Sequence, residues 1–319
     1  MGSRLLHTRF RFIPREQAMA AQRPYTRREQ LLTIVLFILP GAVIYTLFLI
    51  VPIVQAGYYS LYNWNGLGPL TDFVGFDNYT RAFQHNIFQN SIMNTLTIMV
   101  LSLVVQLPLA LILAIMVGRK LPGRFLFRSI FFLPYVFSEI ITAIIWTFVY
   151  NPGSGLLNTV LATIIPDYQP IGWLANRDIA LYAIFAVITW KYFGLHMILY
   201  MAGLQAINTE IEEAARIDGA SEFDVLRYIT VPLLAPTIRL TIYLSVLGSF
   251  NQFVLVWILT AGGPANATQV MASYMYRFGI KSFNLSYGSA IAVIIFAISL
   301  IFSIGYQRAV MRRDYVGTA

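Results

Sequence analysis

Six long apolar segments, separated by shorter polar stretches, constrain this chain more than any other feature of its sequence. A helix that crosses a lipid bilayer needs roughly 20 mostly apolar residues. The segments that meet this requirement are about residues 31–54, 92–117, 125–150, 179–201, 237–259 and 287–306. The composition agrees, because 58% of the 319 residues are hydrophobic and only 11% are charged. We therefore predict an all-α integral membrane protein with six transmembrane helices.

The basic residues are concentrated on alternate sides of these segments. Seventeen of the 22 Lys and Arg residues lie in the N-terminal tail, the loops after the second and fourth segments, and the C-terminal tail. Cytoplasmic loops of membrane proteins carry the excess of basic residues. Both termini are therefore predicted to face the cytoplasm, and the alternation supports six spans.

The organisation predicted from this pattern is one membrane domain with two tails. A basic cytoplasmic tail covers residues 1–30, the transmembrane domain covers residues 31–310, and a short cytoplasmic tail covers residues 311–319. The net charge of +8 is interpreted as an orientation signal that also contacts anionic lipid. Binding to nucleic acid is not expected, because no nucleic-acid-binding module follows the tail.

The sequence offers little enzymatic chemistry. Cysteine is absent, and the three histidines, His7, His85 and His196, lack metal-ligand spacing. No G-x-x-x-x-G-K-[ST] motif is present, so the chain has no phosphate-binding loop of that type. We expect no catalytic residue, no bound metal and no bound cofactor in this chain.

The most informative stretch is the loop formed by residues 208–236, which contains six of the 14 acidic residues. Thr209 and Glu212 have the spacing of a capping box at a helix start. Gly219 follows Asp218 and can take the positive φ that ends a helix. Ser221 can cap a second short helix, which Pro232 and Pro236 would end. The loop therefore predicts two short cytoplasmic helices joined by a turn.

This helix pair is expected to bind a protein rather than lipid. Its first helix would carry Ile211, Ala214 and Ala215 on one face, and its second would carry apolar anchors including Phe223. Amphipathic helices commonly insert into grooves on partner proteins. The alternative is a helix pair on the membrane surface, but such helices favour basic polar faces, and this one is acid-rich.

The spacing of the loop carries a resemblance to a known family. Glu213-Ala214-Ala215, three residues, Gly219, nine residues and then Ile229-Thr230-Val231-Pro232 resembles the EAA loop of ABC importer permeases. The family pattern is E-A-A-x3-G-x9-I-x-L-P, and Val231 in place of Leu is the only departure. The resemblance implies a type I importer permease fold with a cytoplasmic coupling helix.

The resemblance also implies roles and partners for the loop. A separate ABC ATPase dimer, which binds ATP and Mg, would hold the loop in a cleft. The residues that the resemblance assigns to this coupling are Glu213, Ala214, Ala215, Asp218, Gly219, Phe223, Ile229 and Pro232. A second permease subunit, in a heterodimer, and an extracytoplasmic solute-binding protein are the other expected partners, in a bacterial plasma membrane.

Further matches lie outside the loop and are similar to the carbohydrate-uptake branch, with its maltose-type and glycerol-phosphate-type permeases. They are Phe76-Asp77-Asn78-Tyr79, Phe131-Phe132-Leu133-Pro134, Ala202-Gly203-Leu204-Gln205-Ala206-Ile207 and Thr260-Ala261-Gly262-Gly263-Pro264. Together with the loop they cover roughly residues 30–310. The resemblance implies transport of a sugar or sugar derivative by alternating access.

Polar and aromatic residues inside the spans are candidates for the solute pathway. Polar groups within membrane spans are costly and mark pathways or packing contacts. Amides and carboxylates bind sugar hydroxyls, and aromatic rings cover apolar sugar faces. The candidates are Glu139, Trp190, Phe250, Asn251, Gln252 and Phe253. The alternative is hydrogen bonding between helices, with a Glu139–Lys191 pair as one form.

Two other functions remain open from the sequence. An ion-driven secondary transporter would carry inverted repeats and broken helices around midplane charges, and no clear repeat is visible. A membrane-embedded enzyme would need a nucleophile, a metal or an acid–base pair within the membrane, for which Glu139 and Lys191 alone give little support. The coupling loop favours the importer permease over both.

Overall fold

The computed structural model describes residues 26–118 and 123–311. Within these ranges the chain is helical, and β pairing is limited to an isolated bridge between Tyr62 and Phe73. The predictions that concern most of both tails lie outside the described residues, as do Arg119 and Lys120, two of the basic residues in the predicted cytoplasmic loop after the second segment. The chain divides into two compact units, Met1–Gln55 and Ala56–Ala319.

The first unit contains the first apolar helix. It is composed of α2 (Arg27–Tyr45), the π-helical turn η1 (Thr46–Ile50) and most of α3 (Val51–Tyr59). Residues Leu31–Tyr59 form one continuous helix long enough to cross a membrane, and none of its apolar window is buried.

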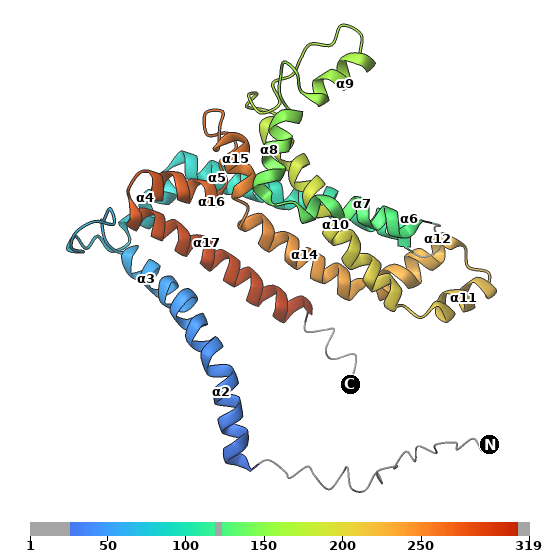
Figure 1. Ribbon diagram of the computed structural model, residues 1–319, viewed down its shortest axis with the longest axis horizontal. Coiled ribbons are helices and arrows are strands. Elements are labelled where there is room, and N and C mark those ends of the chain that lie inside the picture. The colour runs from blue at the N-terminus through green and yellow to red at the C-terminus, as the bar shows by residue number, and fades with distance from the viewer. Residues whose placement is uncertain (1–25, 119–122, 312–319) are drawn as a thin grey trace, which may run out of the picture. The chain divides into compact units, whose positions relative to one another are not determined.

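Three further helices of the second unit are long and apolar enough to span a membrane. They are α5 with η2 and α6, α10, and α17 with η5 (Figure 1). Their bounds are Asn86–Leu101, Ser102–Gln106 and Leu107–Gly118 for the first, Ala180–Ala206 for the second, and Leu285–Tyr306 and Gln307–Met311 for the third. Pro108 lies inside this continuous helix, two residues after η2. Proline is tolerated in membrane-spanning helices because neighbouring groups can satisfy the freed carbonyl.

The two remaining spans are bent. The third joins α7 (Arg124–Val136) to α8 (Glu139–Val149) at an angle of 98°. The fifth is reached through α12 (Glu222–Val225), η3 (Leu226–Thr230) and α13 (Val231–Leu233), and it meets them at 64°. Counting each bent pair as one span gives up to six spans among the described residues. The prediction of six transmembrane helices therefore agrees with the fold.

The fifth span differs from its predicted range of 237–259. α14 runs over Ala235–Phe250 and stops, Asn251–Phe253 are not helical, and α15 resumes over Val254–Thr260. The apolar length alone predicted one continuous helix. The break coincides with Asn251 and Gln252, the polar pair within the segment. These polar residues therefore mark the end of the helix, which the apolar length of the segment does not.

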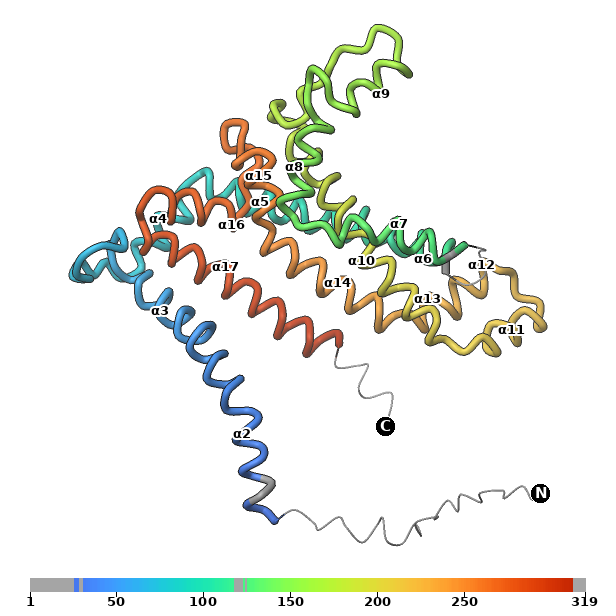
Figure 2. Tube along the Cα trace, in the orientation of Figure 1, coloured from blue at the N-terminus to red at the C-terminus, as the bar shows by residue number. Residues whose placement is uncertain are grey.

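Short helices connect the spans. They are α4 (Asp77–Gln84), α9 (Leu156–Ile164), α11 (Thr209–Ile217), α12 (Glu222–Val225), η3 (Leu226–Thr230), α13 (Val231–Leu233), α16 (Met271–Tyr274) and η4 (Met275–Lys281). Figure 2 shows that α11 and α12 lie at the end of the second unit where α10 ends and α14 begins. The loop is therefore directly connected to two spans, α10 and α14.

The core of the second unit is organised along α10. The N-terminal half of α10 packs with α8 and α15 in one apolar cluster, which includes Ala143, Ile184 and Leu255. Its other half packs with α6 in a second cluster. A Cβ on Gly194 would lie 2.0 Å from the Phe131 carbonyl oxygen, so only glycine lets α10 approach α7 this closely. Both bent spans are therefore held by α10.

Candidate functional site: the loop between α10 and α14

The first helix of the loop begins one residue earlier than the predicted cap. Asn208 is the N-cap, and its side-chain oxygen accepts a hydrogen bond from the Glu210 amide at 3.0 Å. The predicted capping box between Thr209 and Glu212 is therefore wrong. Glu212 is only 4% exposed, and its carboxylate accepts a hydrogen bond from the Thr230 hydroxyl at 2.8 Å. The tertiary contact with η3 outcompetes the local cap.

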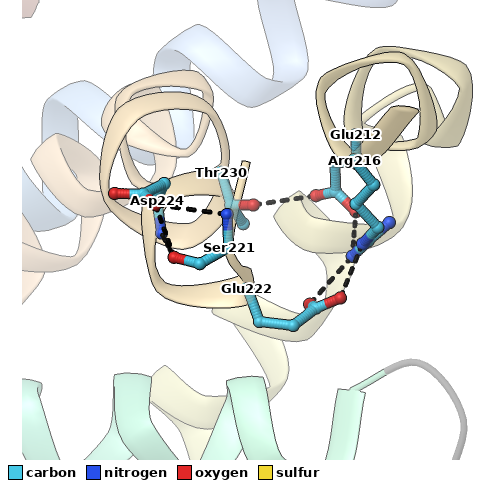
Figure 3. A network of polar contacts seen from close by, with 6 residues as sticks. All are labelled: Glu212, Arg216, Ser221, Glu222, Asp224 and Thr230. Carbon is cyan, nitrogen blue, oxygen red and sulfur yellow. Dashed lines mark hydrogen bonds and ion pairs between the residues drawn. The ribbon is translucent and has the colours of Figure 1, made fainter. Parts of the chain in front are cut away.

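An ionic network ties the two short helices together (Figure 3). The Arg216 side chain donates to the Glu222 carboxylate through Nε at 2.7 Å and through Nη2 at 3.0 Å. Its Nη2 also lies 3.9 Å from Glu212. The hydrogen bond with Glu222 raises the pKa of Arg216 above its usual value. Bidentate arginine–carboxylate contacts fix geometry, so α11 and α12 are oriented as a pair.

The second helix starts as predicted. Ser221 accepts a hydrogen bond from the Asp224 amide, and the Asp224 carboxylate accepts one from the Ser221 amide, at 3.2 Å each. This reciprocal arrangement is a capping box.

The turn between the helices depends on Gly219. Its φ is +92°, and a Cβ placed there would meet nothing within 4 Å. Asp218 caps α11 with its amide bonded to the Ala214 carbonyl. The positive φ predicted at Gly219 is thus present, and the need for glycine is conformational, because no neighbour would obstruct a side chain.

The predicted coupling residues are largely on the surface of the loop. Glu213, Ala214, Asp218, Gly219, Phe223 and Pro232 are exposed, and Ala215 and Ile229 are half-buried. Phe223 is 65% exposed and Ile217 is 86% exposed. Ile217 was missed by the sequence reasoning, although an isoleucine in the last turn before a glycine was available as a signal. Exposed large apolar side chains at one site mark an interaction surface.

A cavity of about 910 Å³ lies beside the network. It is lined by Ile115, Met116, Leu204, Thr209, Glu212, Glu213, Arg216, Glu222, Phe223, Val225, Leu226 and Thr230. The lining residues come from the end of α6, from α10, from both short helices of the loop and from η3.

The bond between Thr230 and Glu212 gives a testable prediction about the stability of the loop. Thr230→Val removes the hydroxyl that donates to the buried Glu212 carboxylate, which costs about 1–3 kcal/mol. We expect faster proteolytic cleavage of the loop and a lower Tm. Thr97→Val is the matched control, because the exposed Thr97 hydroxyl donates only to its own helix, to Met93. Equal proteolysis rates for the two variants would contradict this role of Glu212.

The candidate pathway residues lie at the two helix breaks. Glu139 begins α8, directly after the break of the third span, and accepts a hydrogen bond from the Tyr192 hydroxyl. Trp190 packs edge-on against Trp146 with ring centroids 5.6 Å apart. Among the described residues no salt bridge joins Glu139 to Lys191; the Lys191 ammonium donates instead to the Phe137 carbonyl at 2.5 Å. A direct Glu139–Lys191 salt bridge is therefore absent, but the Glu139 carboxylate still interacts electrostatically with the Lys191 ammonium. The interhelical hydrogen bonding of that alternative is present.

The other four candidates surround the break after α14. Phe250 is buried and packs against Phe302. Gln252 is 7% exposed, and its Nε2 has no hydrogen-bond partner within the described chain. Asn251 is exposed and donates to the Leu247 carbonyl at 2.9 Å. Phe253 stacks on Trp257. A buried amide without a partner is rare, and a ligand hydroxyl would satisfy it.

Within the described residues, no group of three or more His, Asp or Glu side chains is placed to hold a metal ion.

Comparison with known proteins identifies the family. Residues 106–314 match the family model described as "Binding-protein-dependent transport system inner membrane component". A probable ABC transporter permease protein of Pyrococcus horikoshii is 35% identical, over 86% of this chain and 94% of its own length. A trehalose/maltose transport system permease protein of Thermococcus litoralis is 33% identical, over 88% of this chain and 94% of its own.

Solved structures agree with these relatives. A bacterial alginate ABC transporter, in complex with an alginate pentasaccharide-bound periplasmic protein, contains a similar chain with a TM-score of 0.76 and 25% identity. The match covers 90% of this chain and 96% of that one. The chain belongs to the family of inner membrane components of binding-protein-dependent transport systems.

Proposed function

We propose that this chain is the membrane-spanning permease subunit of an ATP-driven ABC importer that takes up a sugar or sugar derivative. The observation that carries this proposal is the exposed loop built around Gly219, with Ile217 and Phe223 presented to solvent. A separate ATPase dimer would receive this surface. The chain itself would be non-catalytic, with ATP and Mg bound by the ATPase subunits.

Sugar as the substrate class is supported by the similar proteins. They include trehalose/maltose and lactose transport system permease proteins, and the similar solved structure is an alginate ABC transporter. An extracytoplasmic solute-binding protein would deliver the sugar, and a second permease subunit would complete the channel. Both termini would face the cytoplasm, as the distribution of basic residues indicates.

The mechanism that follows is alternating access. ATP binding would close the ATPase dimer and move the loops docked on it. Because α10 and α14 flank the loop directly, its displacement would be transmitted to the spans and open them outward. ATP hydrolysis would return the inward-facing state. A ligand can drive such a change only by binding one state better than the other.

The solute pathway would pass the breaks of the third and fifth spans. Discontinuous helices form the substrate sites of many transporters, because their ends expose polar backbone groups. Glu139 and Trp190 lie at or beside the first break, and Asn251, Gln252 and Phe253 form the second. The unpartnered Gln252 amide would donate to a sugar hydroxyl.

This pathway is tested by Gln252→Leu. We expect the KM for uptake of oligosaccharide to rise about tenfold, because a lost hydrogen bond of this kind costs roughly 1–1.5 kcal/mol. Stability should be unchanged or higher, because the variant removes an unsatisfied buried amide. Gln89→Leu on the exposed face of α5 is the matched control. An unchanged KM for Gln252→Leu would remove this residue from the pathway.

The proposed subunit role is tested by affinity purification of the tagged chain from detergent-solubilised membranes. We expect an ATPase and a second six-span permease to copurify with it. Purification of the chain alone, under conditions that preserve other ABC importers, would argue against the role.

A further inference from the structure

Lys191 is a buried ammonium group that the proposed pathway does not use. It lies in the middle of α10 and is only 4% exposed. Among the described residues it forms no salt bridge with a carboxylate. A lysine within a membrane span is costly unless other groups compensate its charge. The partners of the Lys191 ammonium therefore indicate the role of this residue.

The compensation comes from the end of α7 and from the nearby Glu139 carboxylate, which interacts electrostatically with the ammonium. The ammonium donates to the Phe137 carbonyl at 2.5 Å and to the Tyr135 carbonyl at 3.4 Å. It also lies 5.8 Å from the ring of Tyr135 and 5.5 Å from that of Tyr192. The last carbonyls of a helix have no intrahelical partner and carry partial negative charge. The Lys191 ammonium therefore donates to carbonyl groups that backbone amides would bind if α7 continued for another turn.

The beginning of α8 is held in the complementary way. The Ser138 side chain caps α8 by accepting from the Ile141 amide at 3.2 Å. Glu139 occupies the first turn, where a carboxylate is favoured by the helix dipole, and it accepts a hydrogen bond from Tyr192. Neighbouring residues of α10, Lys191 and Tyr192, thus bind the two sides of one break.

The backbone contact at Gly194 keeps this part of α10 against α7. A Cβ there would overlap the Phe131 carbonyl. Sharp kinks have an identifiable cause such as proline. Pro134 lies near the end of α7 and favours a break there, and the side chains of α10 then hold the 98° bend.

We propose that Lys191 is a positioning residue that fixes the break of the third span and thereby places Glu139. α10 continues through Ile207 and Asn208 into α11 of the coupling loop. α10 therefore carries Lys191 and also leads directly into the coupling loop. The transport consequence rests on the proposed function: movement of the loop reaches the third span through Lys191. The geometry of the break does not depend on that function.

The direct test is a distance measurement between spin labels on either side of the break. The chain has no cysteine, so Leu126→Cys and Phe148→Cys provide two exposed label sites, on α7 and α8. The labels are measured in the full complex with partner cysteines replaced. In Lys191→Met we expect the distance distribution to broaden about twofold or more, because the freed carbonyls no longer fix the kink. Lys191→Arg should restore a narrow distribution, since its guanidinium supplies several donors.

Labels on Phe296→Cys and Ile304→Cys, both on α17, are the control pair, and their distribution should not change. In the same complexes Lys191→Met should lower the maximal uptake rate about tenfold or more with little change in KM, as expected for a lost positioning contact. If Lys191→Met does not assemble, Tyr192→Phe is measured instead, and it should broaden the same distribution. A native distribution in the assembled variant would overturn the proposal. If the distribution broadens in Lys191→Met but even the wild-type complex shows no ATP-driven uptake, the role of Lys191 at the break stands and only the proposed function is overturned.

Discussion

Replacing Gly219 with proline should release the ATPase from this chain and abolish ATP-driven uptake. The φ of Gly219 is +92°, whereas proline holds φ near −65°. The turn between α11 and α12 cannot form in the variant, and the Arg216–Glu222 contact across it is lost with it. We expect no ATPase to copurify with Gly219→Pro, while the second permease subunit still does.

Two controls separate the turn from a general loss of folding. Gly219→Ala adds a methyl group with nothing within 4 Å, so it should cost only about 1–2 kcal/mol of backbone strain and leave partial ATPase binding. Gly68→Pro introduces the same kind of strain, because its φ is +71° and its surroundings are also open. Gly68 lies far from the loop in sequence, and its variant should keep the ATPase. Retention of the ATPase by Gly219→Pro would refute the role of the turn.

The second large effect is expected at Phe223. This side chain is 65% exposed, so it contributes little to the folded chain alone. If it inserts into a pocket on the ATPase, its replacement by a charged residue should behave as an interface hot spot, at about 2–4 kcal/mol. Phe223→Asp is therefore expected to weaken binding of the purified ATPase roughly 30-fold to 1,000-fold.

The matched control is Phe283→Asp, which places the same charge at another exposed phenylalanine, at 73%, between η4 and α17. Binding of the ATPase is measured by titration against the permease complex in detergent. Thermal stability is measured alongside and should be similar for both variants. Equal ATPase affinity in the two variants would place Phe223 outside the interface.

Much of the fold follows from patterns in the sequence. The apolar segments located the spans because lipid requires long apolar helices. Gly219 and Ser221 were predictable because turn and cap chemistry are local, and both behave as expected. Asn208 displaced Thr209 as the cap because Glu212 is bound by Thr230, a contact between residues 18 positions apart that no local pattern reveals.

The breaks in the spans were harder to foresee. The apolar segment 125–150 predicts one continuous span, but the chain turns by 98° shortly after Pro134. The bend is held by Lys191, which is more than 50 residues away, so its partner could not be recognised from spacing. The opposite charges of Glu139 and Lys191 predict a pair, whereas Lys191 donates to carbonyls at the end of α7 and Glu139 accepts from Tyr192.

The measurement that tests the central claim most directly is uptake of labelled oligosaccharides by proteoliposomes. The liposomes contain this chain with its copurified partners, and the solute-binding protein is supplied outside. We expect uptake only when ATP is present at the ATPase face, and we expect ionophores that collapse proton and sodium gradients to leave it unchanged. Uptake by the chain alone, driven by an imposed ion gradient without ATP, would contradict the importer and establish a secondary transporter instead.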